Sequence, residues 1–566
     1  MRNQSIGKYL CQCSLGELRH LPASIPRMLS ATIVLFFLWM VSYAEERPPS
    51  LVAQEGGFSL SVPVVFTQIP ARHGTMQSEI PPLRRLAGGS RIVLLDSRQP
   101  SKNVEILTRD FFAAGSPDIS FDGRRMLFIG KRREEDSLGV WEMELSWHTV
   151  RPIVQLATDC IEARYLSTIF TLEATSPEYL ICLSNIGADG IGALYTCHMD
   201  GTRLRRITFF PDGANHPFQL GDGRLVFSAP TVVEGKARAT SRPEKEPRTA
   251  DCSMLYTVNI DGTDISAFTS TLETPADQTM PCEASDGRVF FVEAARQAGA
   301  GTSILFVSRN RSLHSRQTLA SMAGGNFCSI SSTPDGHLLI GYRAAGAATS
   351  GILAMRGEHH APLVPVFDSA DYDEVQAMAV CERPEPAGRS SVVDDQADFG
   401  YLYGLNSYLS DTKAGTAIVP GQIKRVEVLK ALDSGGRENG TAPARPLNHD
   451  PDQSSAASLG LAPVESDGSF FLRVPARTAL RLRTLDAQGN TLQSMQSWIW
   501  VMPREGRGCI GCHEDRNLSP PNRHVLALRV PPRAVGVAEE PPAKDHTSRQ
   551  STHANRPAAE IRRGEP

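Results

Sequence analysis

One short pattern recurs through the first two thirds of the chain: a turn of aspartate and glycine leads into a run of apolar residues. It occurs as "FDGRRMLFIG" (121–130), "GDGRLVFSA" (221–229), "SDGRVFFVE" (285–293) and "PDGHLLIGY" (334–342). Asp-Gly supplies the positive φ angles of a tight hairpin turn, and β-branched and aromatic residues suit half-buried strands. The repeat therefore predicts a succession of β-hairpins.

A second hairpin pattern follows several of these strands. In "ALYTCHMDGTRLRRITF" (193–209) and "MLYTVNIDGTDISAFTS" (254–270), another Asp-Gly turn separates two apolar runs. Two hairpins in a unit of about 45 to 65 residues match a four-stranded propeller blade. Five clear units, and a sixth built from residues 58–68 and 90–107, predict a β-propeller over residues 45–385. Six blades are preferred, and seven are the alternative.

These units resemble the blades of the TolB-like propeller family, which combine the same Asp-Gly turns and apolar strands. The resemblance implies an all-β fold but no particular function, because propellers serve both as enzymes and as binding platforms. His216 precedes one blade strand, where a loop could face the central channel. A functional histidine and a structural one are both compatible with that position.

The composition changes after "VCERPEPAGRSS" (380–391), which has the proline and glycine content of a linker. Strand-like runs, several of them joined by Asp-Gly and Gln-Gly turns, follow at 422–432, 459–475, 479–493, 497–503 and 522–532. We predict a small antiparallel β-sandwich-like domain over residues 386–533. The polar, proline-containing tail at 534–566 is expected to be disordered.

The N-terminus has the pattern of a secretory signal peptide. A basic residue precedes the apolar run 29–41, and small residues at Ser42 and Ala44 define a cleavage site. The run is short for a membrane span, which needs about 20 residues. Residues 1–44 are thus predicted to be a signal peptide, and Met28 is an alternative start that would make the preceding stretch an extension. We expect export to the periplasm or an equivalent compartment, with no stable membrane span after cleavage.

The net charge and the cysteine content indicate which partners and which disulfide bonds to expect. The net charge of −4 gives no electrostatic case for binding nucleic acid. Export would place the chain in an oxidising compartment. Seven cysteines lie outside both the presequence and the pair discussed below, and we expect buried small residues with one or two disulfides among them: Cys160, Cys182, Cys197, Cys252, Cys282, Cys328 and Cys381.

The most specific motif is "CIGCH" (509–513), inside "REGRGCIGCHEDRNLSPP" (504–521). Two cysteines three positions apart can form thioether bonds to both vinyl groups of one haem, and the next histidine can bind its iron. A structural zinc site would need a second Cys/His pair, and only His524 and His449 lie nearest. A redox dithiol would need a β-α-β context, whereas strand and proline-rich coil flank this pair. The motif therefore favours a haem anchor over a metal knuckle or a dithiol.

The stretch "DGSFFLRVPARTALRLRTLDAQGNTLQSMQSWIWVMPREGRGCIGCHE" (467–514) and the following "HVLALRVPP" (524–532) resemble the middle domain of the hydrazine synthase alpha subunit family. In that family a TolB-like propeller precedes the haem domain. The resemblance implies one covalent haem c, attached to Cys509 and Cys512, with His513 as an axial ligand of the iron.

The sequence also departs from that family. In the hydrazine-forming branch a tyrosine shortly after the motif ligates the iron, and no tyrosine follows His513 in this sequence. The sequence also contains no second Cys-x-x-Cys-His motif. Hydrazine synthesis itself is therefore not expected. The sixth iron ligand is open: Met502 and Met495 are candidates, and core packing is the alternative for both.

These inferences predict an exported monohaem c-type cytochrome that works in electron transfer or haem-based redox chemistry with an unknown redox partner protein. Two alternatives stay open: an oxidoreductase enzyme with an open haem iron, and a propeller-based binding protein with an accessory haem. No catalytic residue is identified. Arg504, Arg507 and Arg516 flank the motif and either pair with haem propionates or remain solvated.

Overall fold

The computed structural model describes the chain in twelve ranges: 62–71, 86–96, 104–231, 252–270, 275–296, 301–322, 324–359, 361–409, 418–432, 456–495, 497–511 and 524–538. These ranges belong to one compact unit that begins at Ala53. Their regular structure is strand, apart from two single turns of 3-10 helix at Arg309–Arg311 and Ala527–Arg529. Within them, no helix has the length and apolar character needed to cross a membrane. The predicted signal peptide (1–44) lies outside the described residues.

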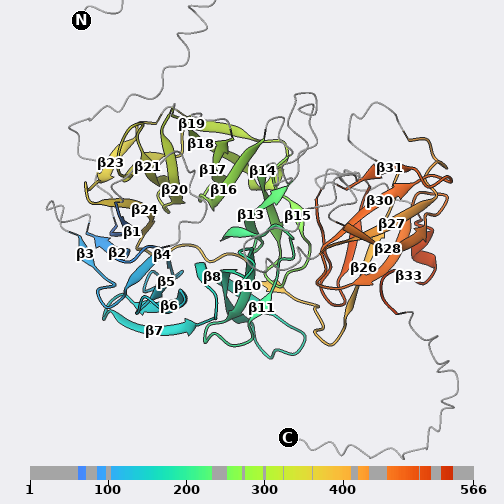
Figure 1. The fold of residues 1–566 in the computed structure, drawn as a ribbon, viewed down its shortest axis with the longest axis horizontal. Coiled ribbons are helices and arrows are strands. Elements are labelled where there is room, and N and C mark those ends of the chain that lie inside the picture. Colours follow the sequence, from blue (N-terminus) through green and yellow to red (C-terminus); the bar gives the residue numbers. More distant parts are fainter. Residues whose placement is uncertain are drawn as a thin grey trace, which may run out of the picture. The chain divides into compact units, whose positions relative to one another are not determined.

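The first part of the described chain folds into six blades of four strands each (Figure 1). One parallel bridge, Ser253 with Asp277, links blades 4 and 5 into a single sheet, and a short extra strand joins blade 3. Blades 1 to 3 are β24 (Tyr372–Ala379), β1 (Val64–Pro70), β2 (Arg91–Leu95), β3 (Glu105–Ile106); β4 (Ala113–Ile119), β5 (Arg125–Lys131), β6 (Gly139–Glu144), β7 (Thr149–Val154); and β8 (Cys160–Phe170), β9 (Glu178–Ile186), β10 (Gly192–His198), β11 (Arg205–Arg206). Blades 4 to 6 are β12 (Asn215–Gln219), β13 (Leu225–Thr231), β14 (Cys252–Val258), β15 (Ser266–Ala267); β16 (Ala276–Glu283), β17 (Arg288–Ala295), β18 (Thr302–Ser308), β19 (Gln317–Ser321); and β20 (Asn326–Ser332), β21 (His337–Arg343), β22 (Gly351–Arg356), β23 (Val364–Phe367). The first strands of neighbouring blades contact one another around the ring. The six-bladed prediction is thus confirmed for the described residues.

The ring is closed by strands from its two ends. β24, the last propeller strand in the sequence, pairs antiparallel with β1, the first. Gln68 of β1 donates a side-chain hydrogen bond of 3.0 Å to Glu374 of β24, and Thr67 donates one of 2.9 Å to Gln376. Pairing the two ends in one blade leaves no open edge at the junction, which is how propellers avoid exposed strand edges.

The predicted linker is fixed to the propeller. The Arg383 amide donates to the Phe121 carbonyl at 2.9 Å, and its guanidinium donates to the Ile119 carbonyl at 2.8 Å. Further on, β25 (Arg389–Ser390) pairs in parallel with the end of β8. The proline and glycine content of 380–391 therefore marks irregular backbone that crosses the propeller surface, because proline lacks the N–H that regular strand pairing needs.

The second domain consists of two four-stranded sheets. Its strands are β26 (Phe399–Gly404), β27 (Arg425–Ala431), β28 (Ala456–Pro463), β29 (Phe470–Pro475), β30 (Leu480–Leu485), β31 (Thr491–Ser494), β32 (Gly506–Cys509) and β33 (Arg533–Ala534). The sheet β28-β27-β30-β31 is antiparallel, as predicted. The sheet β32-β26-β29-β33 is mixed, because β32 and β33 run parallel to their neighbours. The fully antiparallel prediction is wrong for this second sheet.

Two predicted strands are absent from the described residues. The segment 497–503 forms only one isolated bridge, between Leu480 and Ile499, although Trp500 within it is completely buried. Residues 524–532 contain the short helix Ala527–Arg529, and the strand β33 comes only after them. Apolar residues report burial, and burial does not require pairing in a sheet.

Five of the predicted buried cysteines carry free thiols: Cys160, Cys182, Cys197, Cys282 and Cys381. All except Cys381 are buried, and burial raises the pKa of Cys160 and of Cys282 to about 12. They pack as small apolar residues within and between blades, so the expectation of disulfides is wrong for these five.

The second domain shares a hydrophobic core with blades 3 and 4. Trp500 packs edge-on against Phe210 at 5.3 Å between ring centroids and against Phe209 at 5.6 Å. Its indole N–H donates to the carbonyl oxygen of Gly262, in the turn between β14 and β15, at 2.9 Å. The same buried cluster includes Leu402 of β26. The propeller and the second domain are therefore packed together without an intervening solvent layer at this point.

This shared core predicts a difference between two glycines. Gly262 (φ +91°) and Gly287 (φ +80°) both adopt the left-handed conformation, but a Cβ on Gly262 would lie 2.9 Å from the Met502 sulfur, whereas one on Gly287 would meet nothing within 4 Å. Alanine should cost about 1–2 kcal/mol of backbone strain at either position. Gly262→Ala should lose about 1–3 kcal/mol more from overpacking. Urea unfolding of both variants measures the difference, and equal midpoints would contradict the docking contact.

Candidate functional site

The predicted haem anchor begins at the edge of the mixed sheet of the second domain. Cys509 ends β32, where it is half-buried and lies opposite Gly404 of β26. The Leu405 amide donates to the Cys509 carbonyl at 2.9 Å. The backbone that carries the first cysteine is therefore fixed by strand pairing. Cys512, His513 and Arg516 lie outside the described residues.

Two glycines let the motif lie close to the chain that follows β26. A Cβ on Gly508 would approach the Tyr403 ring to 2.6 Å, and one on Gly511 would approach the Leu409 carbonyl oxygen to 2.3 Å. Real Cβ atoms do not approach other atoms so closely, and at Gly511 the obstacle is rigid backbone. Glycine is therefore required at position 511 for the observed backbone path of residues 509–511.

An aromatic ladder lies on β26 and β29 of the mixed sheet. Tyr401 lies 5.5 Å from Phe399 and 5.8 Å from Phe471, measured between ring centroids, and Tyr403 lies 6.2 Å from Phe471. These rings are partly exposed apart from Phe399. Side chains alternate between the two faces of a strand, and Tyr403 pairs with Gly508 whereas Gly404 pairs with Cys509. The aromatic rings therefore lie on the face of the sheet opposite the Cys509 side chain.

The segment before Cys509 is held by a buried carboxylate. Glu505 Oε1 accepts a hydrogen bond from the Asp264 amide at 2.8 Å, and Oε2 accepts one from the Met502 amide at 2.6 Å. Arg507 is only 8% exposed and forms an ion pair with the Asp264 carboxylate at 3.4 Å. Burial raises the pKa of Glu505 to about 7, although both hydrogen bonds and Arg507 favour the charged form.

The flanking arginines differ in environment. Arg507 is buried, which excludes the solvated interpretation for this residue, while Arg504 is 55% exposed and lies 3.4 Å from Asp394. Met502 has no exposed surface, and Met495 is partly buried against the same core cluster. Both methionines take part in core packing, and the sixth iron ligand stays a prediction.

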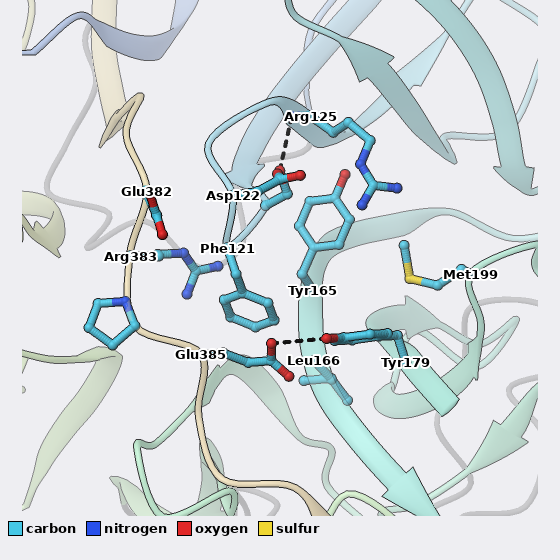
Figure 2. Close-up of a pocket in the computed structure, with 12 residues that line it drawn as sticks. Phe121, Asp122, Arg125, Tyr165, Leu166, Tyr179, Met199, Glu382, Arg383 and Glu385 are labelled. Carbon is cyan, nitrogen blue, oxygen red and sulfur yellow. Dashed lines mark hydrogen bonds between the residues drawn. The ribbon is translucent and has the colours of Figure 1, made fainter. Parts of the chain in front are cut away.

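A second candidate site is a pocket of about 850 Å³ on the propeller (Figure 2). It is lined by the start of blade 2, by strands of blade 3 and by the segment 382–385 that crosses the propeller surface. Its lining residues are Ser120, Phe121, Asp122, Arg125, Tyr165, Leu166, Tyr179, Met199, Glu382, Arg383, Pro384 and Glu385. The volume lies within the range of small-molecule and peptide-side-chain sites.

Charged groups of both signs occupy this pocket. Figure 2 shows Arg125 beside the Tyr165 ring at one end, and Tyr179 joined to Glu385 at the other. The Tyr179 hydroxyl donates to Glu385 at 3.0 Å, which raises the pKa of Tyr179. Glu142, the partner of Arg125 at 3.5 Å, already accepts hydrogen bonds from Arg151 at 2.8 Å and from the Tyr165 hydroxyl at 2.9 Å. Arg125 therefore keeps donors for another anionic group.

The sequence did not indicate this pocket, because its walls come from separated parts of the chain that carry no recognisable motif. His216, which the sequence did single out, is buried and lies 3.0 Å from Glu162 through Nδ1. The described residues contain no group of three or more metal-binding side chains. His216 and Glu162 thus form a buried polar pair between blades 3 and 4.

Known proteins share both the motif region and the fold. The family "hydrazine synthase alpha subunit middle domain" matches residues 421–514, a span that includes Cys509, Cys512 and His513. Hydrazine synthase subunit alpha of Kuenenia stuttgartiensis is 21% identical over 563 residues, which cover 82% of this chain and 68% of that protein. The match begins well before the motif, so it includes the propeller.

One solved structure shares the architecture over most of the chain. Kuenenia stuttgartiensis hydrazine synthase superimposes with a TM-score of 0.67 at 19% identity, over 86% of this chain and 75% of that one. TolB from Acinetobacter baumannii gives a TM-score of 0.38 at 12% identity, over 63% of this chain and 73% of that one. The fold and the matched middle domain together support a likeness to the hydrazine synthase alpha subunit.

Proposed function

We propose that the protein is an exported monohaem c-type cytochrome that works in electron transfer or haem-based redox chemistry in the periplasm or an equivalent compartment. Cys509 and Cys512 would hold the haem covalently, and His513 would ligate its iron. The observation that carries the proposal is the fixed, half-buried position of Cys509 at a sheet edge, inside a Cys-x-x-Cys-His motif. When bound, the haem supplies a one-electron redox couple.

The chain's own residues have two tasks in this proposal. The strand pairing of β32 with β26 holds the backbone of Cys509, and Gly508 lets the Tyr403 ring lie directly over that backbone. The buried Arg507 places a positive charge two residues before Cys509. Because the Asp264 carboxylate pairs with this charge and Glu505 lies close to it, Arg507 would hold the segment in place and would not act as an uncompensated cation beside the haem.

A second candidate function is the binding of a partner by the propeller, and the pocket in Figure 2 favours it. Arg125 offers a guanidinium to a carboxylate at one end. Glu382 and Glu385 offer carboxylates to a basic group at the segment that crosses the surface, and Phe121 and Tyr179 provide aromatic walls. A peptide segment with one acidic and one basic side chain fits this arrangement.

The haem proposal predicts one covalent haem per chain. Protein matured with haem-attachment machinery should give a pyridine haemochrome spectrum that corresponds to one haem, and the double variant Cys509→Ala/Cys512→Ala should lose it entirely. Cys282→Ala, which removes a buried thiol of blade 5, serves as the matched control and should keep full haem content. Haem content that is unaffected by the double variant would contradict the assignment of the anchor.

Electron transfer and an open-site enzyme differ in how the iron responds to small ligands. If the haem transfers electrons only, its iron has two axial ligands from the protein, and the absorption spectrum should not change with carbon monoxide, cyanide or azide. A spectrum that shifts at low ligand concentration would reject pure electron transfer and favour the oxidoreductase alternative. If the spectrum stays unchanged, Met502→Leu and Met495→Leu show which of the two methionines, if either, is the sixth ligand.

The binding proposal predicts that partner capture depends on the pocket and not on the haem. Retention of exported proteins on the immobilised chain should survive Cys509→Ala/Cys512→Ala and fall about tenfold in Arg125→Gln, since a charge-assisted hydrogen bond contributes about 1.5–3 kcal/mol. Arg311→Gln, at an exposed position of blade 5, is the control. Equal retention by the two arginine variants would exclude the pocket as the binding site.

A further inference from the structure

The segment that leads into the haem anchor is docked on one turn of the propeller. This turn, residues 259–264, joins β14 to β15 in blade 4. The Trp500 indole donates to the Gly262 carbonyl at 2.9 Å, Glu505 accepts from the Asp264 amide at 2.8 Å, and Arg507 pairs with the Asp264 carboxylate at 3.4 Å. Three side chains of residues 500–507 thus reach the same short loop.

The turn has a conformation that does not depend on docking. In blade 3, residues 200–203 form the same structure: the Thr202 amide donates to Asp200 at 2.9 Å, as the Thr263 amide donates to Asp261 at 3.0 Å. The last residues, Arg203 and Asp264, have nearly equal φ angles of +53° and +58°. The blade 3 turn is largely exposed. The Asp264 amide is therefore preorganised for an acceptor, and docking requires little rearrangement.

Glu505 connects this turn to β26 and to the segment before β32, the strand that contains Cys509. Its side chain is 5% exposed and uses both oxygens, one for Asp264 and one for Met502. Its own carbonyl accepts from the Tyr401 amide of β26 at 2.7 Å. One residue, four positions before Cys509, thus contacts blade 4, β26 and the segment that leads into β32.

Packing stability alone does not account for a carboxylate here. A buried charge costs free energy, and an apolar residue of similar size often stabilises such a site equally well. A carboxylate with two directional hydrogen bonds instead specifies one relative position of the groups it joins. The arrangement at Glu505 is therefore better suited to fixing geometry than to adding stability.

We propose that Glu505 is a positioning residue for the haem: it fixes the Cys509 segment on the blade 4 turn, so that the propeller sets the surroundings of the haem. This inference rests on the proposed function for the haem itself. The contact between Glu505 and the turn does not, because it involves only residues of the chain.

The test compares Glu505→Gln with Glu427→Gln in the full-length haem protein. Glu427 is a matched control, since it is 7% exposed, lies in the same domain and pairs with Arg483 at 2.5 Å, away from the motif. In Glu505→Gln the Asp264 and Met502 amides should exchange hydrogen about tenfold faster, because one strong acceptor is lost. The reduction potential of the haem should shift while haem content stays at one per chain. Glu427→Gln should change neither the potential nor those two amides.

Each outcome has one meaning. An unchanged potential and unchanged exchange in Glu505→Gln would overturn the inference. A potential that shifts equally in both variants would overturn it as well, because it would report general loosening of the domain. A wild-type chain without covalent haem would refute the proposed function, while the exchange measurement would still test the contact. If Glu505→Gln does not fold, Glu505→Asp, which keeps the charge but shortens the reach, provides the same comparison.

Discussion

The contact of residues 500–507 with the blade 4 turn is the constraint on which the candidate haem site depends. Trp500 lies in a core that the propeller and the second domain share, and its indole nitrogen is bonded to the Gly262 carbonyl. From that fixed point Glu505 and Arg507 bring the chain to β32, whose pairing with β26 positions Cys509. β32, the edge strand of this sheet, has only four residues, so its position depends strongly on the contacts of residues 500–507 that precede it.

The sequence predicted the architecture where local chemistry determines it. Asp-Gly turns between apolar runs favour hairpins, so the six blades were accessible from pattern alone. In the second domain the same signal was less reliable, because the Asp467-Gly468 turn joins β28 to β29, which lie in different sheets. One wrong strand prediction has a clear physical origin. "SWIWVMP" (497–503) has the composition of a strand because it is buried, but its partners are blades 3 and 4 and not a neighbouring strand. Hydrophobicity along a sequence reports burial and does not identify the partner.

The residues of the candidate site also differ in whether the sequence alone could identify them. The Cys-x-x-Cys-His motif is contiguous, so its cysteines and histidine could be named directly from the sequence. Glu505 could not, because its role depends on Asp264, which is 241 positions away, and a lone glutamate before a glycine-rich segment carries no signal. Residues 382–385, which cross the propeller surface, line part of the pocket in Figure 2, but their composition predicted only a linker. Long-range contacts are what a single sequence specifies least.

Comparison of the two equivalent turns shows why docking at this place requires few special residues. The blade 3 turn "MDGTR" (199–203) and the blade 4 turn "IDGTD" (260–264) share their backbone and their internal hydrogen bonds, so the amide that meets Glu505 exists wherever the repeat exists. What differs is the last side chain: Arg203 is exposed to solvent, whereas Asp264 pairs with the buried Arg507. A repeated fold thus supplies preformed donors, and a change of side chain at one turn, with the carboxylate of Glu505 facing it, can select which blade holds the segment that leads into the Cys-x-x-Cys-His motif.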